Sequence, residues 1–459
     1  MYDFSKKLKL WAIGFMVVGA VGIIAGFMSA PSTVEEVKEI LAHDTAHGGG
    51  HDSHAETTAH VTTEGHGEVT HADTAGHSDA HSDDAHAEHV LHQLQNKPWS
   101  ALYVACFFFM MIALGTLAFY AVNRAAQAGW SPLLFRVMEG ITSYLPIGLI
   151  ILLVILGIST VGHGNHLFAW MDADLIDPSS DKFDKLINNK KGWLNGGWFM
   201  VRAVIYAGLW IAYQIISKKL SRAQDTASDD SNFKKNFKLS AAFLVVFLYT
   251  ESMMSWDWIM SLDPHWFSTL FGWYVFASMF VSGITVIALV TIYLKAGKTD
   301  YLPKVNNSHI HDLAKFMFGI SIFWTYLWFS QFMLIWYADI PEEVTYFVTR
   351  IQDYNLPFFG MLVLNFLFPI LVLMNSDFKR VNWFVVIAGI AILFGHYIDI
   401  YNMVMPATVG TQWFIGLPEI SSILFFLGLF IYVVFTALTK APLEPKRNPF
   451  IHESEQFHY

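Results

Sequence analysis

The chain has 459 residues, of which 54% are hydrophobic and only 14% are charged, and its formal net charge is −10. Because soluble proteins carry about a quarter charged residues, this composition indicates a membrane protein. No basic stripe and no nucleic-acid-binding motif occurs, which excludes nucleic acid as a partner. The single cysteine, Cys106, excludes a disulfide, an iron–sulfur cluster or a four-cysteine zinc site made by this chain alone.

Ten apolar runs are long enough to cross about 30 Å of hydrocarbon as α-helices. They cover residues 10–28, 102–120, 135–158, 193–216, 238–254, 267–293, 313–337, 354–374, 381–401 and 415–438. The sequence therefore predicts an all-α polytopic membrane protein with about ten transmembrane helices. The first run resembles a signal peptide but is long for one, so we expect residues 1–30 to be a retained transmembrane anchor.

The distribution of positive charge predicts the orientation in the membrane. Of the 28 Lys and Arg residues, 20 fall on the side of the N-terminus when the ten runs are threaded in order. The positive-inside rule then places both termini, including the tail 439–459, in the cytoplasm of a bacterial cell. The chain is accordingly expected in the inner membrane, with a helical core over residues 99–438.

The first outer loop, residues 31–98, is of low complexity and rich in histidine. Twelve of the 20 histidines lie between His43 and His92. Neutral imidazoles could capture copper or zinc loosely, with His47, His51 and His54 as weak candidate ligands. The irregular spacing favours a simpler interpretation, a solvated tether without a core that stays mobile until a partner orders it.

Ionisable side chains inside spans are costly unless they are paired or hydrated, so each is a candidate functional group. Glu139, Thr142, Ser143 and Pro146 share one face of the third span near its cytoplasmic end. This stripe fits the inner half of a proton path, and the alternative is a carboxylate that caps the helix near the headgroups.

Two pairs of residues that contain histidine are predicted near the outer surface. His163 and His166 end the third span, and His396 and Asp399 lie on the ninth. A histidine beside a carboxylate can exchange protons near neutral pH. We therefore expect His396 and Asp399 to be the working site, against the alternative of a buried pair that only fixes two helices. All four residues are candidate quinol ligands.

Arg202 lies inside the fourth span and needs an anion. Glu251 on the fifth span and Glu419 on the tenth enter from the same side, and we expect Arg202 to pair with Glu251 or with Asp399. The connector 249–274 is aromatic and acidic, and it is expected to lie flat over the helices with Glu251 pointing into them. These residues complete the predicted proton path.

The ten spans, the connector SWDWIMSLDPHWFSTLFGWY and the segment GHYIDIYNMVMP of the ninth span resemble one family. The chain is similar to the NrfD-type membrane subunits of polysulfide-reductase-like complexes. More narrowly, it resembles the F subunit of bacterial alternative complex III, a quinol:cytochrome c oxidoreductase. The resemblance covers most of residues 100–438 and rests on overall pattern rather than on one short motif.

The resemblance implies two antiparallel four-helix bundles, here about 102–254 and 267–401, with the first span and the last, 415–438, at the periphery. It implies no metal or haem in this chain. Haem and iron–sulfur clusters would belong to partners: an iron–sulfur protein, a multihaem cytochrome c, a paralogous NrfD-like subunit and, in some assemblies, a terminal oxidase. Some members bind quinol, such as menaquinol, near the outer surface, and the F subunit is proposed to conduct protons.

Two other functions remain open from the residues alone. The chain could be a haem b anchor with His163 and His396 as axial ligands, which predicts a Soret absorption band. It could also be a stand-alone ion-coupled transporter, which predicts uptake by this chain alone in liposomes. The aromatic and acidic outer loops favour a subunit of a complex.

Overall fold

The computed structural model describes residues 2–47, 78–161, 165–297 and 299–458, and these residues form helices and loops without a β-strand. Ten helical stretches are long and apolar enough to cross a membrane, which confirms the predicted fold class. They are Lys6–Met28 (α1), His86–Ala125 within α3 (Ser78–Ala125), Pro132–Val161, Gly196–Gln224 (α7), Ser231–Leu262 with α8 (Ser231–Trp258), Phe271–Ala296 (α9), Asn307–Ala338 (α10), Asn355–Leu373, Asn382–Val409 (α14) and Leu417–Leu438 (α15).

Two of these stretches are interrupted. The third consists of η1 (Pro132–Leu134), α4 (Phe135–Ile141), η2 (Thr142–Tyr144) and α5 (Leu145–Val161), and the eighth of α12 (Asn355–Leu362), a π-helix η6 (Val363–Leu367) and α13 (Phe368–Leu373). Shorter helices cover the ends: α2 (Val34–His47), η3 (Ala169–Met171), η4 (Ala173–Leu175), α6 (Lys185–Lys190), η5 (Met260–Leu262), α11 (Pro341–Gln352), η7 (Phe378–Arg380) and α16 (Ile451–Glu455).

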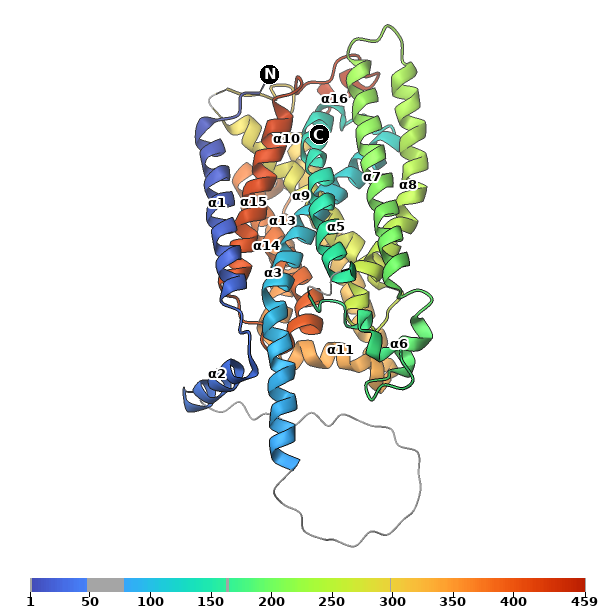
Figure 1. Cartoon of the computed structure of the whole chain (residues 1–459). Helices are drawn as coiled ribbons and strands as arrows, with labels where there is room; N and C mark the ends of the chain where they lie inside the picture. The colour runs from blue at the N-terminus through green and yellow to red at the C-terminus, as the bar shows by residue number, and fades with distance from the viewer. Residues whose placement is uncertain (1, 48–77, 162–164, 298, 459) are drawn as a thin grey trace.

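The long helices form two four-helix bundles. In the first, α3, α5, α7 and α8 contact one another in a ring, and in the second α9, α10, α12–α13 and α14 do the same. Helix α15 packs on α3, and α1 packs along α15 at the edge. Figure 1 shows the long helices running side by side, with both termini toward one end and α2, α6 and α11 at the other.

The two bundles meet where α3 contacts α9, and small residues allow these backbones to approach closely. A Cβ atom on Gly115 would lie 2.1 Å from the carbonyl oxygen of Met279, and one on Gly283 would lie 2.5 Å from the amide nitrogen of Thr116. Close packing through small residues is a common way to hold membrane helices together. The centre of the molecule is therefore this helix pair, and the other helices surround it.

The outer loop differs from the prediction at both of its ends. Helix α2 occupies its start, and α3 begins at Ser78, so its end is helical instead of a loose tether. Val37 of α2 packs against Val90 and Leu91 of α3 in a small apolar cluster, a core that the sequence did not lead us to expect. Of the candidate metal ligands, His51 and His54 lie outside the described residues and His47 is the last residue of α2.

Candidate functional site

The second bundle encloses a polar cluster around Asp399. The carboxylate accepts hydrogen bonds from the hydroxyl of Tyr274, from Oγ of Ser278 at 3.0 Å and from Nε1 of Trp324 at 2.9 Å. Tyr274 and Ser278 lie one turn apart on α9, and Trp324 lies on α10. Ser278, His396 and Asp399 have no exposed surface. Two helices, α9 and α10, thus supply three donors to a carboxylate that has no Lys or Arg bound to it in the part of the chain described.

His396 is connected to this carboxylate mainly through Ser278. Its Nδ1 lies 2.9 Å from Oγ of Ser278 and 3.4 Å from Oδ2 of Asp399. Ser278 has one hydroxyl proton, which its bond to Asp399 uses, so Nδ1 of His396 is the donor toward Ser278. In that tautomer Nε2 carries a free lone pair, and it has no hydrogen-bond partner among the described residues. The ring therefore presents a base on one side and a bonded N–H on the other.

A π-helix brings Asn365 to the same histidine. Nδ2 of Asn365 lies 3.5 Å from Nδ1 of His396, and Asn365 sits inside η6. A Cβ atom on Gly395 would lie 2.1 Å from Oδ1 of Asn365, so glycine is required for this approach. π-Helical turns occur often at functional sites. The backbone is shaped here to bring an amide against an imidazole.

The depth of the pair differs from the prediction. The sequence placed His396 and Asp399 near the outer end of a span that stops at 401, but α14 continues to Val409. The helix runs through Pro406, so the pair lies near the midpoint of α14. A pair at this depth is better placed for transfer through the bilayer than for direct release at the outer surface.

His166 lies far from this pair along α14. His166 is exposed, and its backbone bonds to Asn96, whose side chain also donates to the carbonyl of Thr408. Thr408 lies 12 residues after His396, roughly 18 Å along the helix axis. The ring of His166 instead packs edge-on against His92, with centroids 5.1 Å apart. His163 lies outside the described residues.

Arg202 pairs with neither predicted anion. Its Nε lies 2.7 Å from Oδ2 of Asp257 and its Nη2 lies 2.8 Å from Oδ1, which is a two-point ion pair. Tyr206 and Trp193 also donate to Asp257, which is fully buried. The pair ties the start of α7 to the end of α8. The prediction of Arg202–Glu251 or Arg202–Asp399 is therefore wrong.

Glu139 lies in a buried ion-pair network. Its Oε2 lies 2.7 Å from Nη1 of Arg136, and its Oε1 lies 3.8 Å from Nη2 of Arg124. The hydroxyl of Tyr120 donates to Oε1 at 3.3 Å. Arg136 continues to Asp225 on the loop after α7 at 2.5 Å. Glu139 does not cap its helix at the headgroups, because it is 2% exposed and bound by two arginines.

Thr142 and Ser143 bond to the backbone of the same helix. Their hydroxyls donate to the carbonyl of Glu139 at 3.2 and 2.7 Å, and the chain turns into the short 3-10 segment η2 there. Pro146 follows and lacks an N–H, which favours such a break. The stripe that the sequence predicted is thus a kink beside the Glu139 network.

Glu251 and Glu419 are both buried, in different settings. Glu251 lies on α8 with its Oε1 without a hydrogen-bond partner among the described residues. The connector is shorter than predicted, because α8 extends to Trp258 and Glu251 is inside it. Oε2 of Glu419 accepts the backbone N–H of Gly416 at 2.8 Å, so this carboxylate closes the first turn of α15.

Four members of the central cluster were not chosen as site residues from the sequence. Tyr274 falls in the aromatic connector and Trp324 in an aromatic run of the seventh span, and Ser278 and Asn365 are uncharged, so none of the four is marked as a site by its charge. One signal was available: Tyr274 and Ser278 are four residues apart and so share a helix face with no charge.

In the described parts of the chain, no group of three or more His, Cys, Asp or Glu side chains is arranged to hold a metal ion. No protein-family model matches this sequence, and no curated protein sequence matches it. The geometry of the cluster is therefore the basis for any functional conclusion.

Proposed function

We propose that this chain is an integral-membrane subunit of a respiratory quinol:electron-acceptor oxidoreductase of the alternative complex III type, in which it transfers protons. The ten membrane-spanning helices and the two four-helix bundles support this proposal, since they match the architecture that the resemblance implies. Its partners are an iron–sulfur protein, a multihaem cytochrome c and a paralogous membrane subunit. These partners carry the electrons.

One observation carries the proposal: a histidine and an aspartate lie fully buried near the midpoint of α14, joined by Ser278. Ionisable groups at this depth are costly and mark proton or substrate pathways in membrane proteins. Nε2 of His396 accepts a proton, and the negative charge of Asp399 balances the imidazolium that forms. Reversal of this step returns the proton, so the pair acts as a relay.

Two other acidic residues, Glu251 and Glu139, supply the rest of the path. Glu251 is buried in the first bundle, and one of its oxygens has no hydrogen-bond partner among the described residues. It is the candidate that extends the relay from the second bundle into the first. Glu139 and its arginines lie in the first bundle toward the terminus side, where the path begins. His166 is exposed and separate from the relay, so a quinol at the outer surface is a different site from the His396–Asp399 pair.

The test uses the native assembly. A tagged chain is purified from its own bacterial membrane, the co-purifying subunits are identified by mass spectrometry, and proton release per electron is measured after reconstitution. We expect His396→Gln and Asp399→Asn each to lower the rate of proton release about 100-fold or more, which is the range for loss of a general base. The matched control is His452→Gln, which removes an exposed histidine near the C-terminus.

Four outcomes contradict the proposal or part of it. Purification without redox partners excludes the respiratory assembly, and transport of an ion by the chain alone in liposomes favours the transporter. A Soret band in the chain stripped of partners favours the haem anchor. Unchanged proton release in both variants removes the relay even if the assembly is correct.

A further inference from the structure

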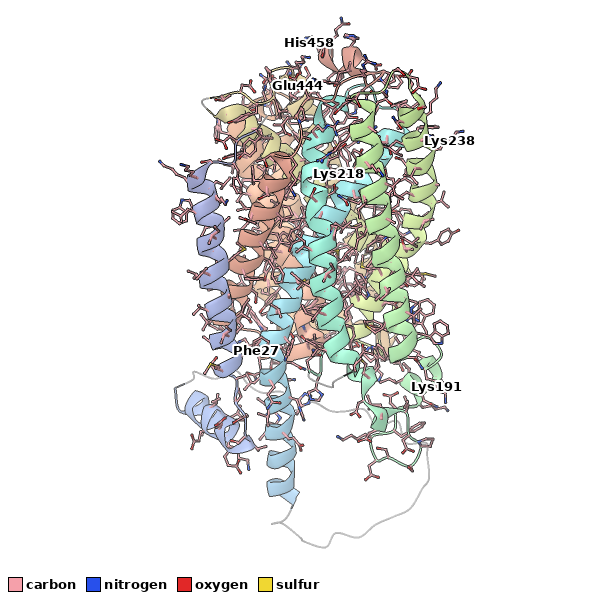
Figure 2. All side chains as sticks on the ribbon, turned by 45° about the horizontal axis from the view of Figure 1, so that its top comes forward. Phe27, Lys191, Lys218, Lys238, Glu444 and His458 are labelled. Atoms are coloured by element: carbon pink, nitrogen blue, oxygen red, sulfur yellow. The ribbon has the colours of Figure 1, made fainter. Side chains whose placement is uncertain are left out.

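A depression of about 430 Å³ opens between α5 and α7 on the terminus side of the molecule. It is lined by Ser143, Gln214, Ile215, Lys218, Lys219 and Arg222. Ser143 comes from the turn before α5, and the others come from the last three turns of α7. Figure 2 shows Lys218 toward the same end as Lys238, Glu444 and His458, and Lys191 at the opposite end.

The depression holds more positive charge than the protein balances. Lys218, Lys219 and Arg222 line it together, and in the described residues none of the three forms an ion pair with a carboxylate. Lys218 and Arg222 lie four residues apart on one helix face, where like charges repel. The Nε atom of Arg222 is buried and has no hydrogen-bond partner among the described residues. A buried, unpaired guanidinium nitrogen is costly, so an anion bound here would stabilise the site.

The surface on the bilayer side of these cations is aliphatic. Ile215 and Ile216 of α7 are 54% and 46% exposed, and Ile150 of α5 is 57% exposed. These helices pack against each other. The groove therefore has cations at the level of the headgroups and branched alkyl side chains below them. A free phosphate matches only the upper part, whereas a phospholipid matches both.

We propose that this depression binds an anionic phospholipid, with its phosphate between Lys219 and Arg222 and its acyl chains along Ile215 and the exposed face of α5. Basic pockets between membrane helices on the cytoplasmic side are suited to such headgroups. The amide of Gln214, which also lines the depression, supplies a neutral donor. The site is independent of the proposed proton relay, because the depression is lined by residues of the first bundle and the relay lies in the second.

The test measures retention of lipid by the purified assembly in detergent. After delipidation, phosphatidylglycerol, phosphatidylcholine or inorganic phosphate is added, and bound lipid and the melting temperature are recorded by native mass spectrometry and thermal unfolding. We expect phosphatidylglycerol to raise the melting temperature, and phosphatidylcholine and phosphate to leave it unchanged. The double variant Lys219→Gln with Arg222→Gln is expected to weaken phosphatidylglycerol binding about tenfold or more, because each removed charge loses one favourable interaction with the lipid headgroup.

The matched control is Lys234→Gln with Lys235→Gln, two exposed lysines on the same side on α8. The single variant Lys219→Gln changes an exposed side chain and is expected to fold normally, with a loss of about threefold. An equal loss in the control shows general attraction to negative lipid and overturns the proposal. An equal effect of inorganic phosphate shows a soluble-anion site, and equal binding of phosphatidylcholine shows a site without charge selection. Both results also overturn it.

Discussion

Arg202 and Asp257 hold the outer ends of two antiparallel helices together through a two-point ion pair, at 2.7 and 2.8 Å. The guanidinium also lies over the ring of Trp193, 4.2 Å from its centroid. Asp257 has no exposed side-chain surface, and Arg202 has 14%. Arg202, which the sequence assigned to a proton path, is here bound to Asp257, a residue outside that predicted path.

We therefore expect Arg202→Met to destabilise the protein by about 3–5 kcal/mol, because it leaves the buried carboxylate of Asp257 without its cation. Arg202→Met combined with Asp257→Leu is expected to recover part of the loss, since it removes both charges. The measurement is unfolding in detergent by denaturant. Lys191→Met is the control, because it removes an exposed positive charge on the same face. Additive losses in the double variant contradict the pair.

The sequence contains enough information to identify Asp257 as the partner of Arg202. The identification requires the position of each residue along its helix as well as its charge. Arg202 lies two turns into α7, and Asp257 lies at the end of α8, which runs the opposite way. Residues at the start of one antiparallel helix and the end of the next are level with each other. The expected fifth span ends at residue 254, which leaves Asp257 in a connector, and this boundary error concealed the pair.

Gly395→Ala is expected to destabilise the second bundle by about 1–3 kcal/mol, the usual cost of adding a methyl group to a packed site. The new Cβ atom would lie 2.1 Å from Oδ1 of Asn365 and 2.8 Å from Cβ of Leu364. The matched control is Gly319→Ala in α10, where nothing lies within 4 Å, and we expect a gain of about 0.5–1 kcal/mol. Thermal unfolding of both variants checks this. Equal stability of the two variants would contradict the close approach.

The central cluster shows what the sequence alone could and could not provide. His396 and Asp399 stand out as ionisable residues in an apolar run, and their spacing of three places them on one face. Ser278 and Trp324 do not stand out, since hydroxyls and indoles are common in membrane helices. Their role depends on which helix packs against which, and a single sequence carries no signal for the contacts of α14 with α9 and α10.

A second outer loop, residues 165–195 between α5 and α7, docks on the connector through Asp184 and His265, whose side chains lie 2.6 Å apart. The pKa of Asp184 is lowered: burial raises it, but the N–H of Ile187 and the His265 ring outweigh burial. A lowered folded pKa gives stability that is complete above the ordinary value of about 3.9 and is lost as the pH falls through the folded value. We expect the loop to detach below pH about 4.

Spin labels on Asp181→Cys and Thr269→Cys measure this detachment, because both side chains are exposed and lie on the two segments. We expect a narrow distance distribution at pH 6 and a broad one at pH 3. Asp184→Asn should broaden it at both values. Asp177→Asn is the control, since the side chain of Asp177 accepts hydrogen bonds from Ser179 of its own loop. A narrow distribution in Asp184→Asn at pH 6 shows that the loop is held by other contacts.

The orientation of the chain can be tested with cysteine labelling, because Cys106 is fully buried and gives no background. Lys235 lies near the start of α8, on the side with 20 of the 28 basic residues, and Asp181 lies on the opposite side. The positive-inside rule predicts that an impermeant maleimide added to intact spheroplasts labels Asp181→Cys and not Lys235→Cys. Lysis should expose Lys235→Cys and serves as the control. Labelling of Lys235→Cys before lysis would show the opposite topology. The proposed proton path would then run in the opposite direction, and the anionic-lipid site would lie in the outer leaflet.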